Sequence, residues 1–114
     1  MAKKSKTSPL KGRWKIIWME TWGQDFVDAE VPGHVTFGNR GNGDFQFGYV
    51  RGSFGWSEKD DYVDTNWGGS DEMDEAHGDI YAKIEEGELR GTIEFFNGDD
   101  SEFRAVREDR NPRG

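Results

Sequence analysis

The sequence contains no cysteine, only three prolines and only two leucines, Leu10 and Leu89, among its 114 residues. The absence of cysteine excludes a disulfide framework, a zinc–thiolate site and thiol catalysis. Two leucines are too few to fill the core of a helix bundle, and no apolar run approaches the roughly 18 residues of a membrane span. The chain is also too short for more than one domain.

Aromatic residues make up for the scarcity of aliphatic ones. A low aliphatic content combined with a net charge of −8 borders on the composition of disordered chains. However, 14% of the residues are aromatic, including five tryptophans. Because each buried aromatic side chain removes roughly 150–250 Å² from water, a small aromatic core suffices, and we predict a folded domain.

Charge is distributed unevenly along the chain. Residues 1–13 carry five Lys or Arg and no acid, whereas residues 20–103 hold 21 acids against five Lys or Arg. We expect solvated tails at 1–11 and 109–114 around a domain at 12–108. The acidic body argues against nucleic-acid binding, which depends on Lys and Arg neutralising phosphates. No apolar segment of the signal-peptide type follows Lys6, which predicts a cytoplasmic protein.

Period-two alternation predicts strands in the first two thirds of the chain. The expected strands are Arg13–Trp22, with Trp14, Ile16 and Trp18 on one face, then Phe26–Val31, His34–Phe37, Asp44–Trp56 and Tyr62–Trp67. Within Asp44–Trp56 the apolar parity changes near Tyr49–Gly52, which requires a bulge or a tight bend. A loop is expected over residues 68–78.

The pattern of the last third of the chain predicts a β-meander. Expected strands at Asp79–Glu85, Glu88–Phe96 and Ser101–Arg107 are separated by the turns Glu86–Gly87 and Asn97–Gly98. Seven or eight short strands joined by short turns favour antiparallel neighbours. A chain this small buries the apolar faces of its strands most simply by closing one sheet on itself. We therefore predict an all-β antiparallel meander barrel.

The tripeptide Gly12-Arg13-Trp14, at the start of the first strand, resembles the Gly-x-Trp motif of lipocalins and their calycin relatives. The resemblance implies an eight-stranded barrel whose closed end holds Trp14, with an Arg near the end of the last strand lying across it. Arg107 shares the strand parity of Phe103 and Ala105 and is the expected Arg.

A second set of motifs covers most of residues 12–107 and resembles a widespread family of small acidic bacterial proteins that carries no established activity. The matching residues are Trp67, Gly69, Asp71, Glu72, Asp74, Gly98, Asp99, Asp100 and Ser101. Members of that family often have a His before the last turn, where this chain has Phe96 or Asn97.

The acidic stretch around residues 71–77 has two functional interpretations besides that of a solvated loop. One is an interaction surface for a basic protein or peptide, formed by Asp71, Glu72, Asp74, Glu75, His77, Asp99 and Asp100. The other is a Ca²⁺ or Mg²⁺ site at Asp71, Glu72 and Asp74, since carboxylate oxygens suit hard cations. The fit to an EF-hand is poor because no helices flank the loop.

The aromatic residues allow a different reading, a small apolar ligand held inside the barrel. The candidate ligand-binding residues are Trp18, Phe47, Tyr49, Arg51, Trp56, Trp67 and Tyr81. The alternative, which we favour, is that most of these rings fill the core, as in other small barrels.

No motif predicts catalysis. Adjacent carboxylates such as Asp99 and Asp100 point to opposite faces of a strand and do not form a catalytic pair, and no serine has a nucleophile-elbow context. We therefore assign no catalytic residues and expect a non-enzymatic binding module with a basic partner. A barrel-interior ligand is the first alternative, and a cation-binding or hydrolytic carboxylate site is the second.

Overall fold

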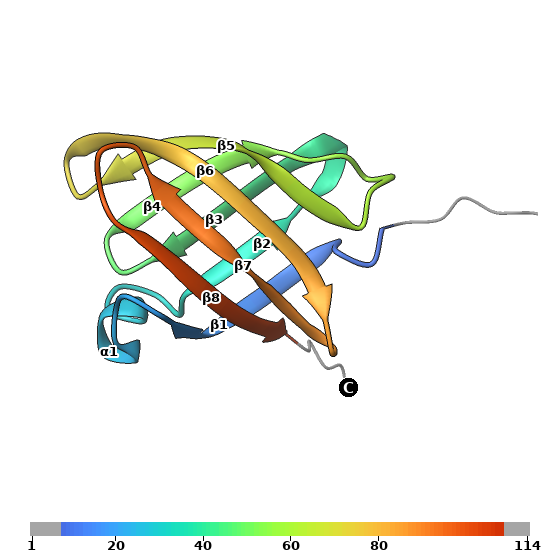
Figure 1. The fold of residues 1–114 in the computed structure, drawn as a ribbon, viewed down its shortest axis with the longest axis horizontal. Helices are drawn as coiled ribbons and strands as arrows, with labels where there is room; N and C mark the ends of the chain where they lie inside the picture. The colour runs from blue at the N-terminus through green and yellow to red at the C-terminus, as the bar shows by residue number, and fades with distance from the viewer. Residues whose placement is uncertain (1–7, 109–114) are drawn as a thin grey trace, which may run out of the picture.

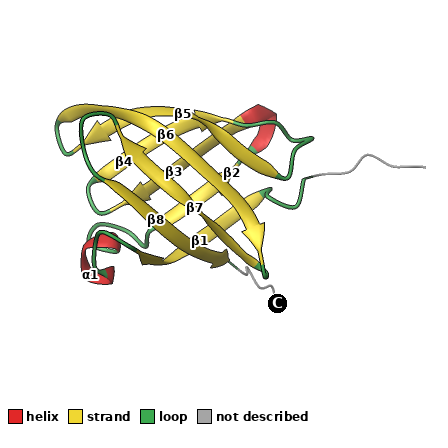
Figure 2. Ribbon diagram, viewed as in Figure 1, coloured by secondary structure: helices red, strands yellow, loops and turns green. Residues whose placement is uncertain are grey.

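The eight strands form one closed antiparallel barrel in sequence order, with β1 also pairing to β8 (Figure 1). A computed structural model describes residues 8–108, so residues 1–7 of the N-terminal tail predicted at 1–11, and the C-terminal tail predicted at 109–114, lie outside this range. The strands are β1 (Gly12–Met19), β2 (His34–Phe37), β3 (Asn42–Phe47), β4 (Val50–Gly55), β5 (Tyr62–Asp71), β6 (Asp74–Glu85), β7 (Glu88–Phe95) and β8 (Asp100–Arg107). A short helix α1 (Gln24–Val27) and a 3-10 turn η1 (Asn39–Gly41) complete the described chain (Figure 2). The predicted all-β meander barrel is confirmed.

Aromatic side chains fill the barrel interior. Phe45 stacks on Phe47 with 5.9 Å between ring centroids and meets the edge of Trp67 at 5.0 Å. Trp67 in turn meets Phe95 at 5.2 Å. Aromatic side chains make up eight of the 20 buried hydrophobic residues, in line with the aromatic-rich composition.

Strand β1 contains an irregularity that the alternation did not predict. The register between β1 and β8 shifts between Ile16 and Trp18, so one extra residue enters β1. As a result Trp14, Ile16 and Met19 point inward, while Trp18 points outward with 40% of its surface exposed. The expectation that Trp18 shares a face with Trp14 is therefore wrong.

The parity change predicted near Tyr49–Gly52 is a tight turn. Phe47 pairs with Val50 across the two-residue connection Gly48–Tyr49, which divides the expected long strand into β3 and β4. Gly48 has φ of 59°, and a Cβ there would lie 2.4 Å from the Phe26 ring. The left-handed φ favours glycine at this position, and the Phe26 ring leaves no room for a Cβ.

Two segment assignments are wrong. Phe26–Val31 is not a strand, because α1 ends at Val27 and an irregular segment leads to β2. The expected loop at 68–78 is instead a long hairpin, in which β5 and β6 pair up to Asp71 and Asp74. Its glycines support strand pairing rather than a loop, since the α-carbon of Gly69 lies so close to β4 that a Cβ there would be 1.8 Å from the Arg51 carbonyl oxygen.

The packed part of the described chain extends before the predicted domain boundary at residue 12. Leu10 is fully buried, and its carbonyl oxygen accepts a hydrogen bond of 2.9 Å from Trp14 Nε1. The apolar side chain of Leu10 thus belongs to the core and not to a solvated tail.

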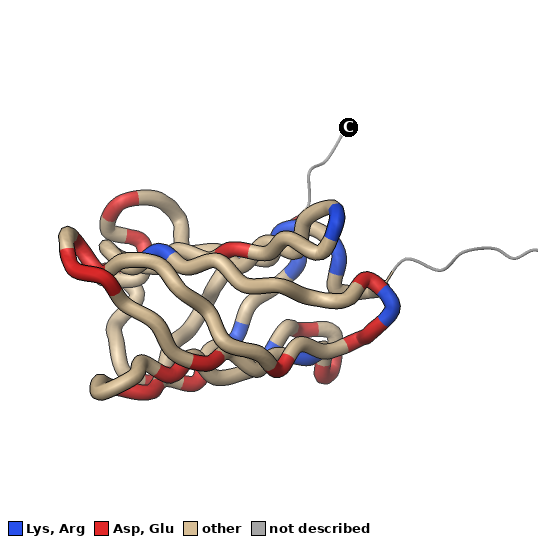
Figure 3. Tube along the Cα trace, turned by 90° about the horizontal axis from the view of Figure 1, so that it is seen from above, with Lys and Arg blue, Asp and Glu red and all other residues tan. Residues whose placement is uncertain are grey.

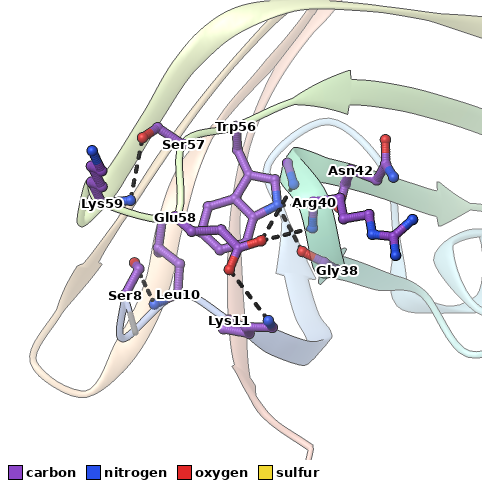
Figure 4. Close-up of polar contacts among 11 residues, drawn as sticks. Ser8, Leu10, Lys11, Gly38, Arg40, Asn42, Trp56, Ser57, Glu58 and Lys59 are labelled. Atoms are coloured by element: carbon purple, nitrogen blue, oxygen red, sulfur yellow. Dashed lines mark hydrogen bonds and ion pairs between the residues drawn. The ribbon is translucent and has the colours of Figure 1, made fainter. Parts of the chain in front are cut away.

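Glu58, in the connection between β4 and β5, links that connection to the chain before β1 and to the η1 turn (Figure 4). Its carboxylate accepts hydrogen bonds from Lys11 Nζ at 3.3 Å and from the backbone N–H groups of Arg40 and Gly41 at 2.7 and 3.4 Å. Burial by itself raises the pKa of Glu58, but the hydrogen bonds from Lys11, Arg40 and Gly41 and the charge of Lys11 outweigh it and lower that pKa. Beside it, Trp56 Nε1 donates to the carbonyl oxygens of Gly38 and Asn42.

Candidate functional site

The meander topology collects four segments that are distant in sequence at one end of the barrel. In an up-and-down barrel every odd-to-even connection lies at the same end, which here is the left end of Figure 1. We call this the acidic end and define it as residues Glu20–Gly33, Gly48–Tyr49, Asp71–Glu75 and Phe96–Asp100. The terminal end, opposite, comprises Ser8–Lys11, Gly38–Gly41, Trp56–Asp61, Glu86–Gly87 and Glu108.

The acidic end carries ten carboxylates and no Lys or Arg. They are Glu20, Asp25, Asp28, Glu30, Asp71, Glu72, Asp74, Glu75, Asp99 and Asp100. The terminal end mixes both signs, with Lys11, Arg40 and Lys59 among its acids. Figure 3 shows this separation, with acidic segments in the loops at the left and most Lys and Arg segments toward the right.

Three of the ten carboxylates are held by the protein itself. Asp28 accepts hydrogen bonds from Gly33 N–H at 2.8 Å and from Gln24 Nε2 at 3.1 Å. Burial raises the pKa of Asp28, but these hydrogen bonds together with the charge of Lys15 lower it overall. Glu30 lies 3.7 Å from Arg51, and Glu20 accepts a hydrogen bond of 3.2 Å from Glu102 N–H.

The other seven make no ion pair within residues 8–108. Four of them surround the tip of the β5–β6 hairpin, where Glu72 adopts a φ of 59° and Met73 is 97% exposed. A methionine this exposed at the centre of four carboxylates contributes nothing to the core. It is therefore available to contact a partner.

The β7–β8 connection forms the second acidic tip. Phe96 is 66% exposed and stacks on the His77 ring of β6, with centroids 5.0 Å apart and planes 19° from parallel. The Phe96 N–H donates to the His77 carbonyl oxygen at 2.8 Å, which fixes the pair. A depression of about 430 Å³ lies beside it, lined in part by Asn66, His77, Asp79, Glu94, Phe96 and Asp100.

The residues predicted to form the interaction surface are therefore all at or next to the acidic end, on two neighbouring hairpins. Asp71, Glu72, Asp74 and Glu75 lie on one, Asp99 and Asp100 on the other, and His77 connects them through Phe96. The sequence interpretation missed the contribution of Glu20–Gly33, which adds Asp25 and three further acids. The signal available was that this segment, like the hairpin tips, contains no Lys or Arg.

The residues predicted to bind an apolar ligand do not line one cavity. Phe47, Trp56 and Trp67 are buried in the core, whereas Trp18, Tyr49 and Tyr81 are each 40% exposed on the outside. Arg51 is exposed and points to the Glu30 carboxylate. Because aromatic rings contact one another across the barrel interior, side chains fill the space that a ligand would need.

The predicted cation site also lacks a suitable geometry. Within the described chain, no group of three or more His, Asp or Glu side chains is arranged to hold a metal ion. Asp71 and Asp74 face each other across the hairpin, but Glu72 does not complete a ligand set with them.

Comparisons with protein-family models, with curated proteins and with solved structures each found no match. The two resemblances noted in the sequence therefore stay predictions. Among residues 8–108, no helix has the length and apolar character needed to cross a membrane. Any assignment of function depends on the surfaces described above.

Proposed function

We propose that this protein is a non-enzymatic binding module whose acidic end docks a lysine- or arginine-rich segment of a partner protein. The observation that carries the proposal is the gathering of ten carboxylates, without a single Lys or Arg, onto one end of a rigid barrel. Concentrated charge of one sign steers oppositely charged partners and accelerates their association.

The energetics of the free protein support this interpretation. Six carboxylates on the two neighbouring hairpins have no ion-pair partner in the described chain and repel one another, which destabilises the folded state. Cationic side chains of a partner would relieve that repulsion. Binding would therefore be strong at low ionic strength and would weaken as salt screens the charges over about 8–10 Å.

Two exposed apolar side chains complement the charge. Met73 is 97% exposed between acids, and Phe96 is 66% exposed next to Asp99 and Asp100. The methylene stems of Lys and Arg pack well on such side chains while their charged heads reach carboxylates. An Arg of the partner over the Phe96 ring would add a cation–π contact.

The filled interior argues against the alternative of a small apolar ligand. Phe45, Phe47 and Trp67 occupy the space that such a ligand would need. A ligand there would have to displace core rings that stabilise the barrel.

The test is a titration of a fluorescent ten-residue lysine peptide into the full chain at 20 mM and at 500 mM NaCl. We expect saturable binding at low salt that is lost at high salt. The triple variant Glu72→Gln, Asp74→Asn, Glu75→Gln should weaken binding by about tenfold, since exposed charge pairs each contribute roughly 0.2–1 kcal/mol.

A matched control removes the same number of charges from the terminal end. The variant Asp60→Asn, Asp61→Asn, Glu86→Gln should change affinity by less than about twofold. Equal losses in both triple variants would mean that the peptide responds to net charge alone, and the proposal would then be wrong.

A further inference from the structure

A depression at the terminal end lies away from the proposed docking surface. It has a volume of about 700 Å³ and is formed between the start of β1, the end of β2 and the end of β8. Its polar lining residues are Lys11, Arg13, Thr36, Asn39, Arg107 and Glu108. We call it the terminal depression. Its volume falls within the range of small-molecule sites.

The lining is positive although the chain as a whole is negative. Three lining residues are Lys or Arg, and Glu108 is the one lining carboxylate. Arg13 forms an ion pair with Glu108 at 3.1 Å, and Lys11 pairs with Glu58, outside the lining, at 3.3 Å. The charges of Arg13 and Lys11 are thus balanced.

Within residues 8–108, the charge of Arg107 is not balanced by a carboxylate. Its guanidinium lies over the Trp14 ring at 4.2 Å and donates to the carbonyl oxygens of Lys11 and Pro9. These partners are neutral, and Arg107 has no carboxylate within 4.0 Å among residues 8–108. Arg107 is therefore held in a fixed orientation with a full positive charge and unused N–H groups.

Thr36 supplies a second, independent sign of an incomplete site. Its Oγ1 atom is buried and has no hydrogen-bond partner in the described chain. Buried hydroxyl groups are normally hydrogen-bonded, and a valine of nearly the same shape would suit this strand position without that cost. Thr36 is one of the residues that line the same depression as Arg107, and it pairs across strands with Arg13.

We propose that the terminal depression binds the oxyanion of a small molecule, a phosphate or a carboxylate group. Arg107 supplies the uncompensated charge, Thr36 Oγ1 donates a hydrogen bond, and Arg13 supplies further N–H donors beside them. A planar guanidinium matches the paired oxygens of either anion. The site lies at the opposite end from the acidic docking surface and does not depend on it.

The experiment titrates inorganic phosphate, and in a separate arm acetate, into the full chain at constant ionic strength maintained with NaCl. Amide chemical shifts and the melting temperature are followed. We expect saturable shifts around residues 11–13, 36–39 and 107, with a dissociation constant of about 1 mM or lower in at least one arm. The arm that saturates identifies the anion. Linear shifts equal to those caused by NaCl in both arms would overturn the proposal.

Substitutions of Thr36 separate binding from stability. Thr36→Val should melt at the same or a higher temperature without ligand, yet bind the anion about tenfold more weakly. Thr36→Ser keeps the hydroxyl and should bind within about twofold of the parent chain, which maintains the test if the valine variant does not fold. Anion binding by Thr36→Val equal to that of the parent chain would overturn the proposal.

Two further variants check location. Lys59→Gln removes a charge from the terminal end outside the depression and should leave anion affinity unchanged. The acidic-end variant Glu72→Gln, Asp74→Asn, Glu75→Gln should also retain anion binding, so that failure of the docking proposal and failure of this one are distinguishable. A loss of anion binding in either variant would contradict the assigned site.

Discussion

Arg107 lies over Trp14 with its guanidinium carbon 4.2 Å from the ring centroid, which ties the last strand of the barrel to the first. The same guanidinium donates to the carbonyl oxygen of Lys11, so it also anchors the chain that enters β1. An Arg in this position was the expectation from the resemblance of Gly12-Arg13-Trp14 to calycin motifs, and the contact is present. Closure of the barrel is thus reinforced by a side-chain contact in addition to the β1–β8 ladder.

We expect Arg107→Ala to lower the free energy of unfolding by about 0.5–2 kcal/mol, because the cation–π contact and two hydrogen bonds are lost. Urea unfolding followed by Trp fluorescence measures the change. Arg51→Ala is the control, since Arg51 is exposed and its ion pair with Glu30 is long at 3.7 Å. A similar loss in both variants would show that the Trp14 contact has no special role.

Adjacent glycines on β5 provide a matched pair of substitutions. A Cβ at Gly69 would lie 1.8 Å from the Arg51 carbonyl oxygen, whereas a Cβ at Gly68 would meet nothing within 4 Å. We expect Gly69→Ala to destabilise the barrel by about 1–3 kcal/mol through overpacking. Gly68→Ala should leave stability unchanged or raise it by less than about 1 kcal/mol. Equal midpoints of denaturant unfolding for the two variants would contradict the close strand approach.

Glu72 sits at the hairpin tip with φ of 59°, a left-handed conformation that costs a non-glycine residue about 1 kcal/mol. Glu72→Gly should therefore raise the free energy of unfolding by about 0.5–1 kcal/mol. Glu72→Gln removes the same charge without relieving the backbone, so it separates strain from electrostatics. If the glutamine variant gains as much stability as the glycine variant, the gain comes from charge.

Glu88 gives the barrel a defined response to acid. Hydrogen bonds from Arg104 and Arg90, together with the charges of these two residues, lower the pKa of Glu88 from 4.5 to about 2. Desolvation acts in the opposite direction but is outweighed. Because the folded-state pKa lies below the unfolded one, this stabilisation is present above about pH 4.5 and is lost as the pH falls toward 2. Urea unfolding at pH 6, 4 and 2.5 should show a difference between the parent chain and Glu88→Gln that shrinks on acidification. A constant difference would contradict the lowered pKa.

Several elements could be predicted from sequence because local alternation decides them. His34–Phe37 is a strand with the predicted bounds, and the turns at Glu86–Gly87 and Asn97–Gly98 separate the expected strands. The outward position of Trp18 cannot be predicted from the sequence, because the bulge depends on the register with β8 and leaves no local signature. Gly68, Gly69 and Gly78 suggested a loop because sequence alone does not distinguish a flexible glycine from one required by close strand packing.

Composition and period-two patterning are enough to predict the fold class, the aromatic-rich core and the excess of acid in the body of the chain, because they reflect local preference and burial. The position of these charges on the folded molecule follows instead from how the strands pair. Closure of an even-numbered meander places Asp25, Asp71 and Asp99, each from a different connection, at the same end. It also brings Arg13, Thr36 and Arg107 together at the opposite end. Such groupings depend on strand pairing over long sequence separations, which no local pattern encodes.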